Sequence, residues 1–468
     1  MSNWSSRALV AVSILAAAAF YAWNFADLFP LIEYRQWIDN SVDWWPALQW
    51  FLDVALLHRS APGFSRATSL LVAAAFRDTC GVSIACHNGM HIAMILASAA
   101  LLAATLRRWV DPFITAGALV FFLFSVPVLD AVAWQATLLD KCAVLGAGVL
   151  TWYAARSDPA SLAWRDQAIL LVLTVLVANT KEAAWICAPS AALLALVRSG
   201  DLKRVALRFA LPAAYLAWHA IYTLVSHTTH SPDDIKRVLS GDPVSNLSAF
   251  ADYLTGAPLP VLALALAAAL LAAAARPASR WLLVWAVLSF AGAIAIPLRT
   301  TAQSPFYLLV PMFYLTILLA LAFAAAAAPR LVALRSAVAI AGLCLLTVQV
   351  SSLVRRYSYY AARAEMSRNF QTVLAAVRAQ LGERRPELVT FQYPAGNHQA
   401  YMFVGSTGEH SHALARYISP HGADERDIAA LRLIIRDAEA EKATAPRKGE
   451  MIVLLRADLS LERLAVTE

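Results

Sequence analysis

The sequence predicts an all-α polytopic membrane protein with a small α/β domain at its C-terminus. Of the 468 residues, 60% are hydrophobic and 15% are charged, whereas soluble globular chains are about 25% charged. The mean hydropathy is +0.59, and the apolar residues gather in stretches long enough to span a bilayer. Beyond Val354 the composition becomes polar. We therefore expect residues 1–354 to form a transmembrane domain and residues 355–468 to form a soluble domain outside the membrane.

A spanning helix needs about 20 mostly apolar residues, and the sequence offers about eleven such stretches. The predicted spans are 8–28, 82–106, 112–129, 140–155, 167–180, 183–198, 206–226, 258–275, 281–298, 305–328 and 333–353. The first is typical of a signal anchor rather than of a cleaved signal peptide. The fifth and sixth are short and could form one long tilted helix, but Lys181 and Glu182 at their junction favour two helices.

Orientation follows from the loops, because Lys and Arg concentrate in short cytoplasmic loops. Alternate loops are basic and contain Arg7, Arg107, Arg108, Arg156, Arg165, Arg198, Lys203, Arg204, Arg208, Arg276, Arg280, Arg330 and Arg335. The loops between them are acidic and contain Asp27, Glu33, Asp39, Asp43, Asp53, Glu182, Asp233, Asp234, Asp242 and Asp252. This alternation predicts a cytoplasmic N-terminus and a C-terminal domain on the opposite side of the membrane.

Three outer segments are long. Residues 29–81 contain "SVDWWPALQWFLDVALL", whose tryptophans among acids are typical of an interfacial helix. Residues 227–257 are polar and rich in turn residues. The C-terminal domain combines both kinds of periodicity, with helices predicted at 364–383 and 424–443 and strands predicted at 387–393 and 450–456.

Three charges, Asp130, Asp140 and Lys141, lie between two apolar stretches. A charge at the bilayer centre costs about 3 kcal/mol, so we place these residues at the outer ends of two spans, where charges cost little. An ordinary charged loop would explain them, and so would a polar cavity that they line.

The cysteines give no metal-site spacing such as CxxC. They are Cys80, Cys86, Cys142, Cys187 and Cys344. Most lie in apolar stretches and are expected to be small packing residues. Cys80 and Cys86 are also close enough in sequence to form a disulfide.

Five motifs follow one another along the chain. They are "GFSRATSLL" (63–71), "HNGMHIAMILASAALLAATLRR" (87–108), Pro127 to Asp140 with "AVAW" (131–134), "NTKEAAWICAPSAALLAL" (179–196) and "PLRTTAQSPFYLLVP" (297–311). In residues and order they resemble the polytopic glycosyltransferases of the GT-C type, most closely the O-mannosyltransferase-like members, over about residues 8–328. That family carries a paired acid after its first span, where this sequence has the single acids Asp27 and Glu33.

The resemblance implies an enzyme of the bacterial inner membrane that moves a sugar from a polyprenyl phosphate to a periplasmic acceptor, whether protein, lipid or glycan. Asp27 occupies the position of the family's first acid and is the candidate base, with Glu33 second. Arg66, Lys181 and Arg299 are the candidates for the leaving phosphate, which gains charge as the sugar departs.

Further residues in these motifs are expected to bind substrate: His87, His91, Asp130, Lys141, Glu182 and Tyr307. His87 and His91 share a helical face and could form hydrogen bonds in the cavity, pack, or supply half of a zinc site. A divalent metal ion is the one cofactor for which the sequence offers candidates. Besides the two histidines, the candidate metal ligands are the C-terminal residues His398, Glu409, His410 and His412. These could equally be ordinary loop residues.

The alternative interpretation is a non-catalytic transporter or scaffold protein of an envelope polysaccharide pathway. Transporters are commonly built from duplicated halves or from spans broken by Gly and Pro. The sequence shows no internal repeat of that kind, which favours the enzyme. In either case membrane lipid is a partner. The net charge of +7 indicates orientation in the membrane rather than binding to nucleic acid.

Overall fold

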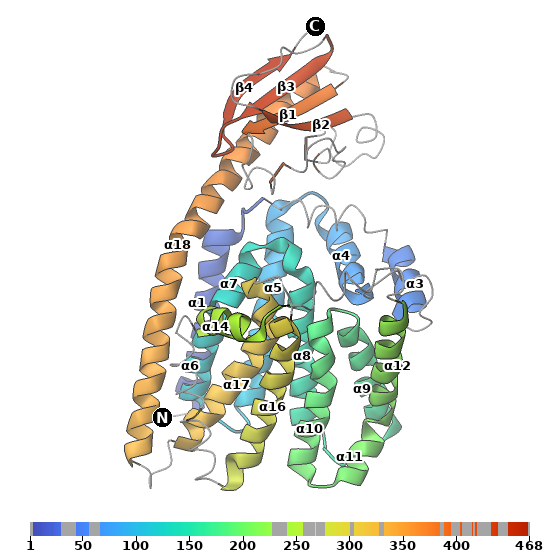
Figure 1. Ribbon diagram of the computed structural model, residues 1–468, viewed down its shortest axis with the longest axis vertical. Helices are drawn as coiled ribbons and strands as arrows, with labels where there is room; N and C mark the ends of the chain where they lie inside the picture. Colours follow the sequence, from blue (N-terminus) through green and yellow to red (C-terminus); the bar gives the residue numbers. More distant parts are fainter. Residues whose placement is uncertain are drawn as a thin grey trace.

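The computed structural model shows a bundle of helices with a small sheet at one end (Figure 1). The described residues are 3–29, 44–55, 66–226, 241–255, 267, 277–299, 304–326, 332–383, 388–394, 403–404, 414, 417–418, 432–438 and 448–466. One helix, α18 (Val332–Glu383), runs beside the bundle and continues into the sheet domain.

The long helices stand side by side along the molecule (Figure 1). They are α1 (Asn3–Phe25), α5 (Ile84–Leu106), α6 (Pro112–Leu123), α8 (Leu138–Arg156), α9 (Trp164–Ala178), α10 (Cys187–Ser199), α12 (Ala210–Ser226), α16 (Pro277–Arg299) and α17 (Leu309–Ala326). In the described part of the chain, five helical segments are long and apolar enough to cross a membrane, and the bent pair of α6 and α7 (Val126–Ala133) would make six. The chain is a multi-pass membrane protein, and the predicted fold class is confirmed.

Some predicted spans are shorter than a full crossing. Helices α9, α10 and α12 have 15, 13 and 17 residues, although they stand among the long helices (Figure 1). Helices α9 and α10 are separate, as the charges at their junction predicted. The predicted span 258–275 lies, apart from residue 267, outside the described residues.

The predicted span 112–129 is not one straight helix. Helices α6 and α7 meet at an angle of 51°, and Pro127 lies in the first turn of α7. Proline lacks the N–H that would continue the hydrogen bonds of α6, and it disfavours helical geometry in the residue before it. The bend turns α7, and Asp130 with it, across the end of the bundle.

Short elements connect the long helices. They are α3 (Trp44–Ala55), α4 (Ala67–Cys80), η1 (Gln135–Thr137), η2 (Glu182–Ile186), α11 (Leu202–Arg208), α14 (Pro243–Thr255) and η4 (Pro305–Leu308). Helix α3 is the predicted interfacial helix, because Trp44 and Trp45 are exposed while Phe51 and Val54 are buried. The core of the bundle centres on η4 and α17, where 89% of the spanning window is buried.

The end of the bundle away from the sheet is basic. Arg208 is buried there and binds Asp166 through two hydrogen bonds of 2.5 and 3.0 Å. Arg198 donates to the carbonyls of Ala154 and Ser157. These arginines come from loops that were predicted to be cytoplasmic, and α11 lies at this end (Figure 1).

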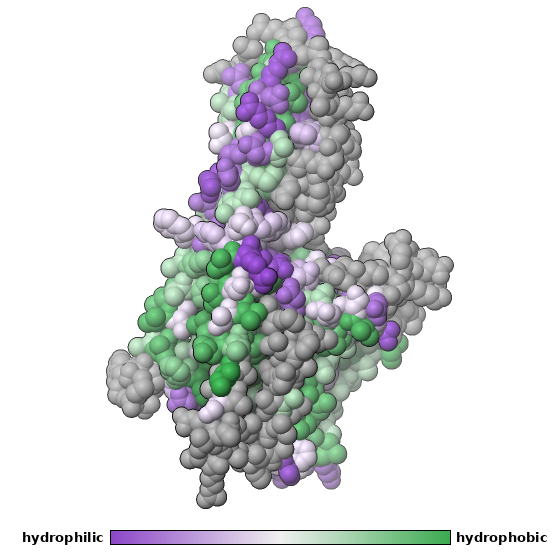
Figure 2. Space-filling view, turned by 60° about the vertical axis from the view of Figure 1, so that its left-hand side comes forward, coloured by the Kyte–Doolittle hydropathy of each residue, from purple (hydrophilic) through white to green (hydrophobic). Residues whose placement is uncertain are grey.

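Figure 2 shows hydrophobic side chains over the bundle and hydrophilic ones where the long helix enters the sheet domain.

A disulfide joins Cys80 to Cys86 and ties the end of α4 to the start of α5. The general expectation of packing cysteines therefore fails for this pair, although Cys142 and Cys187 are buried thiols. Disulfides persist in oxidising compartments such as the periplasm. This bond is therefore consistent with an outer location for the start of α5.

The C-terminal domain is built on the last turns of α18. Its strands are β1 (Leu388–Pro394), β2 (Arg432–Ala438), β3 (Glu450–Leu455) and β4 (Leu461–Val466), in the order β2-β1-β3-β4. β1 is parallel to both neighbours, and β4 is antiparallel to β3. Phe370 and Val377 of α18 pack with Phe391 of β1 and Val453 of β3 in its core.

Two predictions for this domain need correction. The predicted helix 364–383 exists, but it continues the last apolar helix without a break: α18 has 52 residues, about 78 Å at 1.5 Å per residue. The predicted helix 424–443 is wrong over residues 432–438, which form β2, and the rest of that range lies outside the described residues. Its amphipathic spacing also suits an edge strand, and pairing with all seven residues of β1 overrides a weak helical preference.

Candidate functional site

A buried ion pair lies at the end of the bundle nearest the sheet domain. Lys181 Nζ lies 2.5 Å from Asp140 Oδ1, and the two side chains are 9% and 6% exposed. Lys181 belongs to the break between α9 and η2, whereas Asp140 lies in the first turn of α8. The hydroxyl of Ser69 donates to the carbonyl of Thr180, which helps to hold the break against α4.

Aromatic rings border the pair. Lys181 Nζ lies 4.0 Å from the centroid of the Tyr307 ring and 5.8 Å from that of Phe306. The Phe306 ring in turn packs edge-on against Trp134, with centroids 5.3 Å apart. The short helix η4, which begins with Pro305, thus presents two consecutive rings to the cation. Cations gain electrostatic stabilisation over such faces.

Three more of the predicted residues adjoin the pair in sequence or in space. Lys141 follows Asp140, is fully buried, and donates to the carbonyl of Trp134 at 3.1 Å. Glu182 follows Lys181 and lies 3.9 Å from Arg66 Nε. Arg66 is the residue before α4 and is partly exposed. The structure therefore brings together residues from four separate sequence motifs.

Asp130 lies in a second charged group, formed with α18. The hydroxyl of Tyr360 donates to Asp130 Oδ1, and Arg356 Nη1 lies 3.9 Å from Asp130 Oδ2. Burial, and then the charge of Asp130, raise the pKa of the Tyr360 hydroxyl well above its usual value, so it remains a donor. The guanidinium of Arg363, which is 5% exposed, lies 5.8 Å from the centroid of the Trp134 ring. Trp134 thus connects the two groups.

Sequence patterns alone do not reveal this contribution of α18. Arg356, Tyr360 and Arg363 lie beyond the composition change, and we had assigned that region to the soluble domain. Their spacing of four and then three residues places them on one helical face. That spacing was the available signal, but it does not say which element the face contacts.

The remaining predicted residues lie apart from the ion pair. Asp27 is exposed two residues after α1, and its carbonyl accepts a hydrogen bond of 2.6 Å from Gln371. Arg299 is exposed at the end of α16, where its carbonyl accepts from the backbone of Gly241. In the described part of the chain, neither side chain bonds to the Lys181–Asp140 pair. Glu33 lies outside the described residues.

The two histidines are buried on α5. His87 Nε2 forms a hydrogen bond of 2.9 Å with the carbonyl of Gly81, and the His91 ring packs edge-on against Phe76. Among the described residues, no group of three His, Cys, Asp or Glu side chains could hold a metal ion. The predicted C-terminal candidates His398, Glu409, His410 and His412 lie outside the described residues.

Among the described residues at this end of the bundle, basic side chains outnumber acidic ones. The basic residues are Arg66, Lys141, Lys181, Arg356 and Arg363, and the acidic residues are Asp130, Asp140 and Glu182. Ionised donors on an anion make stronger hydrogen bonds than neutral ones do, and arginine suits phosphate in particular. The arrangement can therefore bind an anion beside aromatic surfaces, at the boundary of the membrane-spanning helices.

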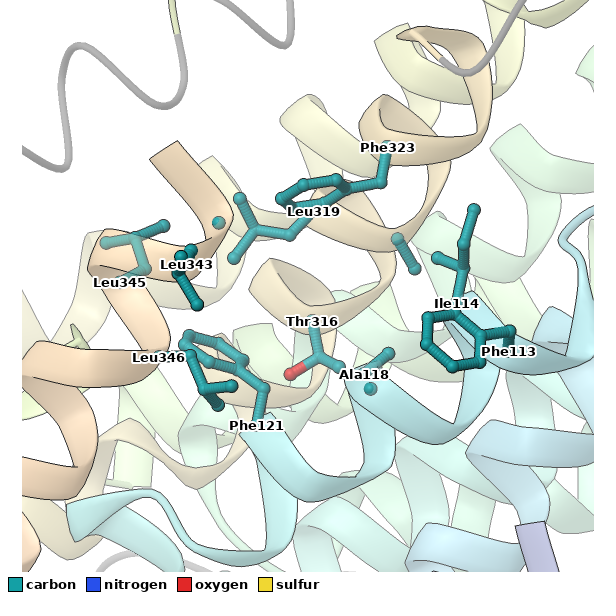
Figure 3. A pocket seen from close by; sticks show the side chains of 13 residues that line it. Phe113, Ile114, Ala118, Phe121, Thr316, Leu319, Phe323, Leu343, Leu345 and Leu346 are labelled. Carbon is teal, nitrogen blue, oxygen red and sulfur yellow. The ribbon is translucent and has the colours of Figure 1, made fainter. Parts of the chain in front are cut away.

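A pocket elsewhere has different chemistry. A cavity of about 420 Å³ lies between α6, α17 and α18. Its lining residues include Phe121, Leu319 and Leu346 (Figure 3). α18 approaches α17 closely here, because a Cβ at Gly342 would overlap the ring of Phe323. None of the described residues that line the pocket is charged, so it suits a hydrocarbon chain and is separate from the charged cluster.

We predict that the ion pair is stabilising only while it is complete. Asp140→Asn leaves Lys181 buried without its closest acid, and Lys181→Met leaves Asp140 buried without its basic partner. Each should lower the free energy of unfolding by about 3 kcal/mol, and the double variant should recover most of it. Chemical denaturation in detergent measures this.

Arg204→Met is the matched control for this experiment. It removes one partner of the exposed Arg204–Asp201 pair and should change stability by less than about 1 kcal/mol. Single variants as stable as the parent protein, or a double variant no better than either single one, would contradict the assigned role of the pair.

Comparison with known proteins gives one structural similarity. No protein-family model matches the sequence, and no curated protein matches it. Among solved structures, the chain is similar to the crystal structure of ArnT from Cupriavidus metallidurans bound to undecaprenyl phosphate. The two share 15% sequence identity, the match covers 95% of this chain and 93% of that chain, and the TM-score is 0.47.

Proposed function

We propose that the protein is an integral membrane glycosyltransferase that moves a sugar from a polyprenyl phosphate to an acceptor outside the cytoplasm. The observation that carries this proposal is the excess of cations beside aromatic rings at the outer end of the spanning helices, directly below the sheet domain. A lipid phosphate lies at that level of a membrane, where its charge needs partners. A purely structural charged loop would not require several buried cations.

The phosphate is the part of the donor that this cluster fits best. When the sugar leaves, the lipid phosphate gains negative charge, and cations already in place stabilise it without reorganisation. Lys181 is the central candidate, since it is buried and faces both Asp140 and the Tyr307 ring. Arg66 is partly exposed beside it, and Arg299 is an exposed cation at the end of α16. We assign Lys181 and Arg66 to the phosphate on this geometry, and Arg299, which lies apart from the pair, on its sequence motif.

The proposed base is Asp27, with Glu33 second. A base must be ionised and must reach the acceptor hydroxyl at about 3 Å. The Asp27 side chain is exposed directly after α1, which leaves it accessible to an acceptor arriving from the aqueous side. Glycosyl transfer proceeds through an oxocarbenium-like state. The base acts at the bond that forms between the sugar and the acceptor, and the cations act at the bond that breaks between the sugar and the phosphate.

We further propose that the basic end of the bundle faces the cytoplasm and that the sheet domain lies in the periplasm of a bacterium. The arginine-rich loops and the Cys80–Cys86 disulfide support this orientation from opposite ends. Basic residues favour the cytoplasmic side, and disulfides favour the outer one.

The cation assignment predicts a defect in donor use, measured per folded protein because Lys181→Ala also removes the partner of the buried Asp140. Arg66→Ala, Lys181→Ala and Arg299→Ala should each reduce turnover by roughly 10- to 150-fold, because one charge-assisted contact typically contributes about 1.5–3 kcal/mol. The measurement is transfer of radiolabelled sugar from a polyprenyl phosphate by the purified protein, with Arg204→Ala as a control at the opposite end. Unchanged turnover in all three variants would remove the phosphate assignment.

The base assignment predicts that Asp27→Asn binds donor normally but transfers sugar at least about 100-fold more slowly, the usual scale for a positioned base. The substitution keeps the shape of the side chain and removes its basicity. Glu33→Gln should have a milder effect in the same assay.

Other outcomes would redirect this assignment. An active Asp27→Asn with an inactive Glu33→Gln would exchange the two roles, and two active variants would move the base to Asp130. A parent protein that transfers no sugar from any polyprenyl phosphate would favour the transporter or scaffold interpretation.

The orientation predicts the activity of fused reporters. Alkaline phosphatase fused after Glu468 should be active, because it folds only in an oxidising compartment, and the same enzyme fused after Arg335 should be inactive. A reversal at either position would place the charged cluster on the cytoplasmic side and exclude a periplasmic acceptor.

A further inference from the structure

Side chains from three elements hold the backbone of residues 26–29, the turn that follows α1. Asn88 Nδ2 donates to the carbonyls of Ala26 and Leu28, both at 2.8 Å. Gln135 Nε2 donates to Leu28 at 3.2 Å and to the Asn88 side-chain oxygen at 2.7 Å. These contacts hold the turn against α5 and η1, within the membrane part of the protein.

The opposite side of the same turn is held by α18. Gln371 Nε2 donates to the carbonyl of Asp27 at 2.6 Å, and the Ser367 hydroxyl donates to it at 3.3 Å. The backbone N–H of Phe29 donates to the Ser367 hydroxyl at 2.6 Å. Three consecutive carbonyls, from Ala26 to Leu28, therefore all accept hydrogen bonds from side chains of other elements.

Phe29 extends the same connection into the C-terminal domain. Its side chain is 1% exposed and belongs to the core of that domain rather than to the bundle. Its ring packs edge-on against Phe370 of α18, with centroids 5.2 Å apart, and against Tyr417 at 5.0 Å. Any shift of the C-terminal domain relative to the bundle would therefore move the turn that carries Asp27.

Capping α1 alone does not require this arrangement. The last carbonyls of a helix lack partners within it, and water commonly satisfies those that lie near the surface. Here the backbone is fixed from both sides, yet the Asp27 side chain is left exposed. Misplacing a reacting group by about 1 Å can reduce a rate by about 100-fold, so a fixed backbone under an accessible carboxylate suits a working base.

We propose that Ser367 and Gln371 are positioning residues through which the C-terminal domain sets the location of Asp27 for sugar transfer. This inference rests on the proposed function, in which Asp27 is the base. It gives the C-terminal domain a role in the reaction itself: α18 fixes the turn, and the domain core anchors Phe29. Neither Ser367 nor Gln371 needs to touch the substrate.

The test is the double variant Ser367→Ala/Gln371→Ala in the full-length protein, assayed for transfer of radiolabelled sugar from a polyprenyl phosphate. We expect kcat to fall about 10- to 100-fold while KM for the donor changes little, since the phosphate cations are untouched. Asn369→Ala is the matched control. It lies on the same helix and donates to the Asp458 carbonyl within the C-terminal domain, so its kcat should stay at the parent value.

A second measurement separates positioning from a merely structural effect. The same double substitution in an Asp27→Asn background should cause no further loss, because residues that act through one group are not additive. Additive losses, a parent-like kcat in Ser367→Ala/Gln371→Ala, or an equal loss in Asn369→Ala would each overturn the proposal. An Asp27→Asn variant with normal transfer would instead refute the base assignment and, with it, this inference.

Discussion

The end of the bundle nearest the sheet domain depends on the buried pair of Lys181 and Asp140. A charge without a partner at this depth would cost several kcal/mol, so the break after α9 and the first turn of α8 must meet. The same requirement orients the neighbours: Lys181 faces the Tyr307 ring just before α17, and Lys141 donates to the Trp134 carbonyl after α7. Asp140 is also favoured by its place in the first turn of a helix, where the helix dipole is positive. One ion pair thus fixes the junction of four segments.

The sequence located this junction because charges inside long apolar runs are rare and expensive. Lys181, Asp140 and Tyr307 could be named from motif order before any contact was known, and most long helices could be placed from hydropathy. The contribution of α18 could not. Tyr360 and Arg363 stand in a polar segment, where a charge needs no special explanation, so nothing local distinguished them from solvated residues. Only the packing of α18 against α7 gives them partners.

Other predictions were wrong or incomplete for the same reason: they depend on contacts between residues that are far apart in the sequence. A count of apolar residues measures the length of a span but not its straightness, so the bend at Pro127 was missed although proline was visible. Residues 432–438 have a pattern compatible with either helix or edge strand, and the partner β1 decided between them. The side chains that hold the turn after α1 come from positions 60 to 344 residues away along the chain. Their importance appears only when α5 and α18 lie beside it.

The two halves of the proposed chemistry need different surroundings, and the fold supplies both. Cations that stabilise a leaving phosphate gain most where water is excluded, because charge interactions strengthen as the local dielectric falls. Lys181 and Lys141 are accordingly buried. A base that meets an acceptor from the aqueous side must instead stay ionised and accessible, and Asp27 is exposed. An exposed side chain normally has few contacts that fix its position. Fixing its backbone from α5, η1 and α18 resolves that conflict, since the carboxylate can remain in water while its attachment point cannot move.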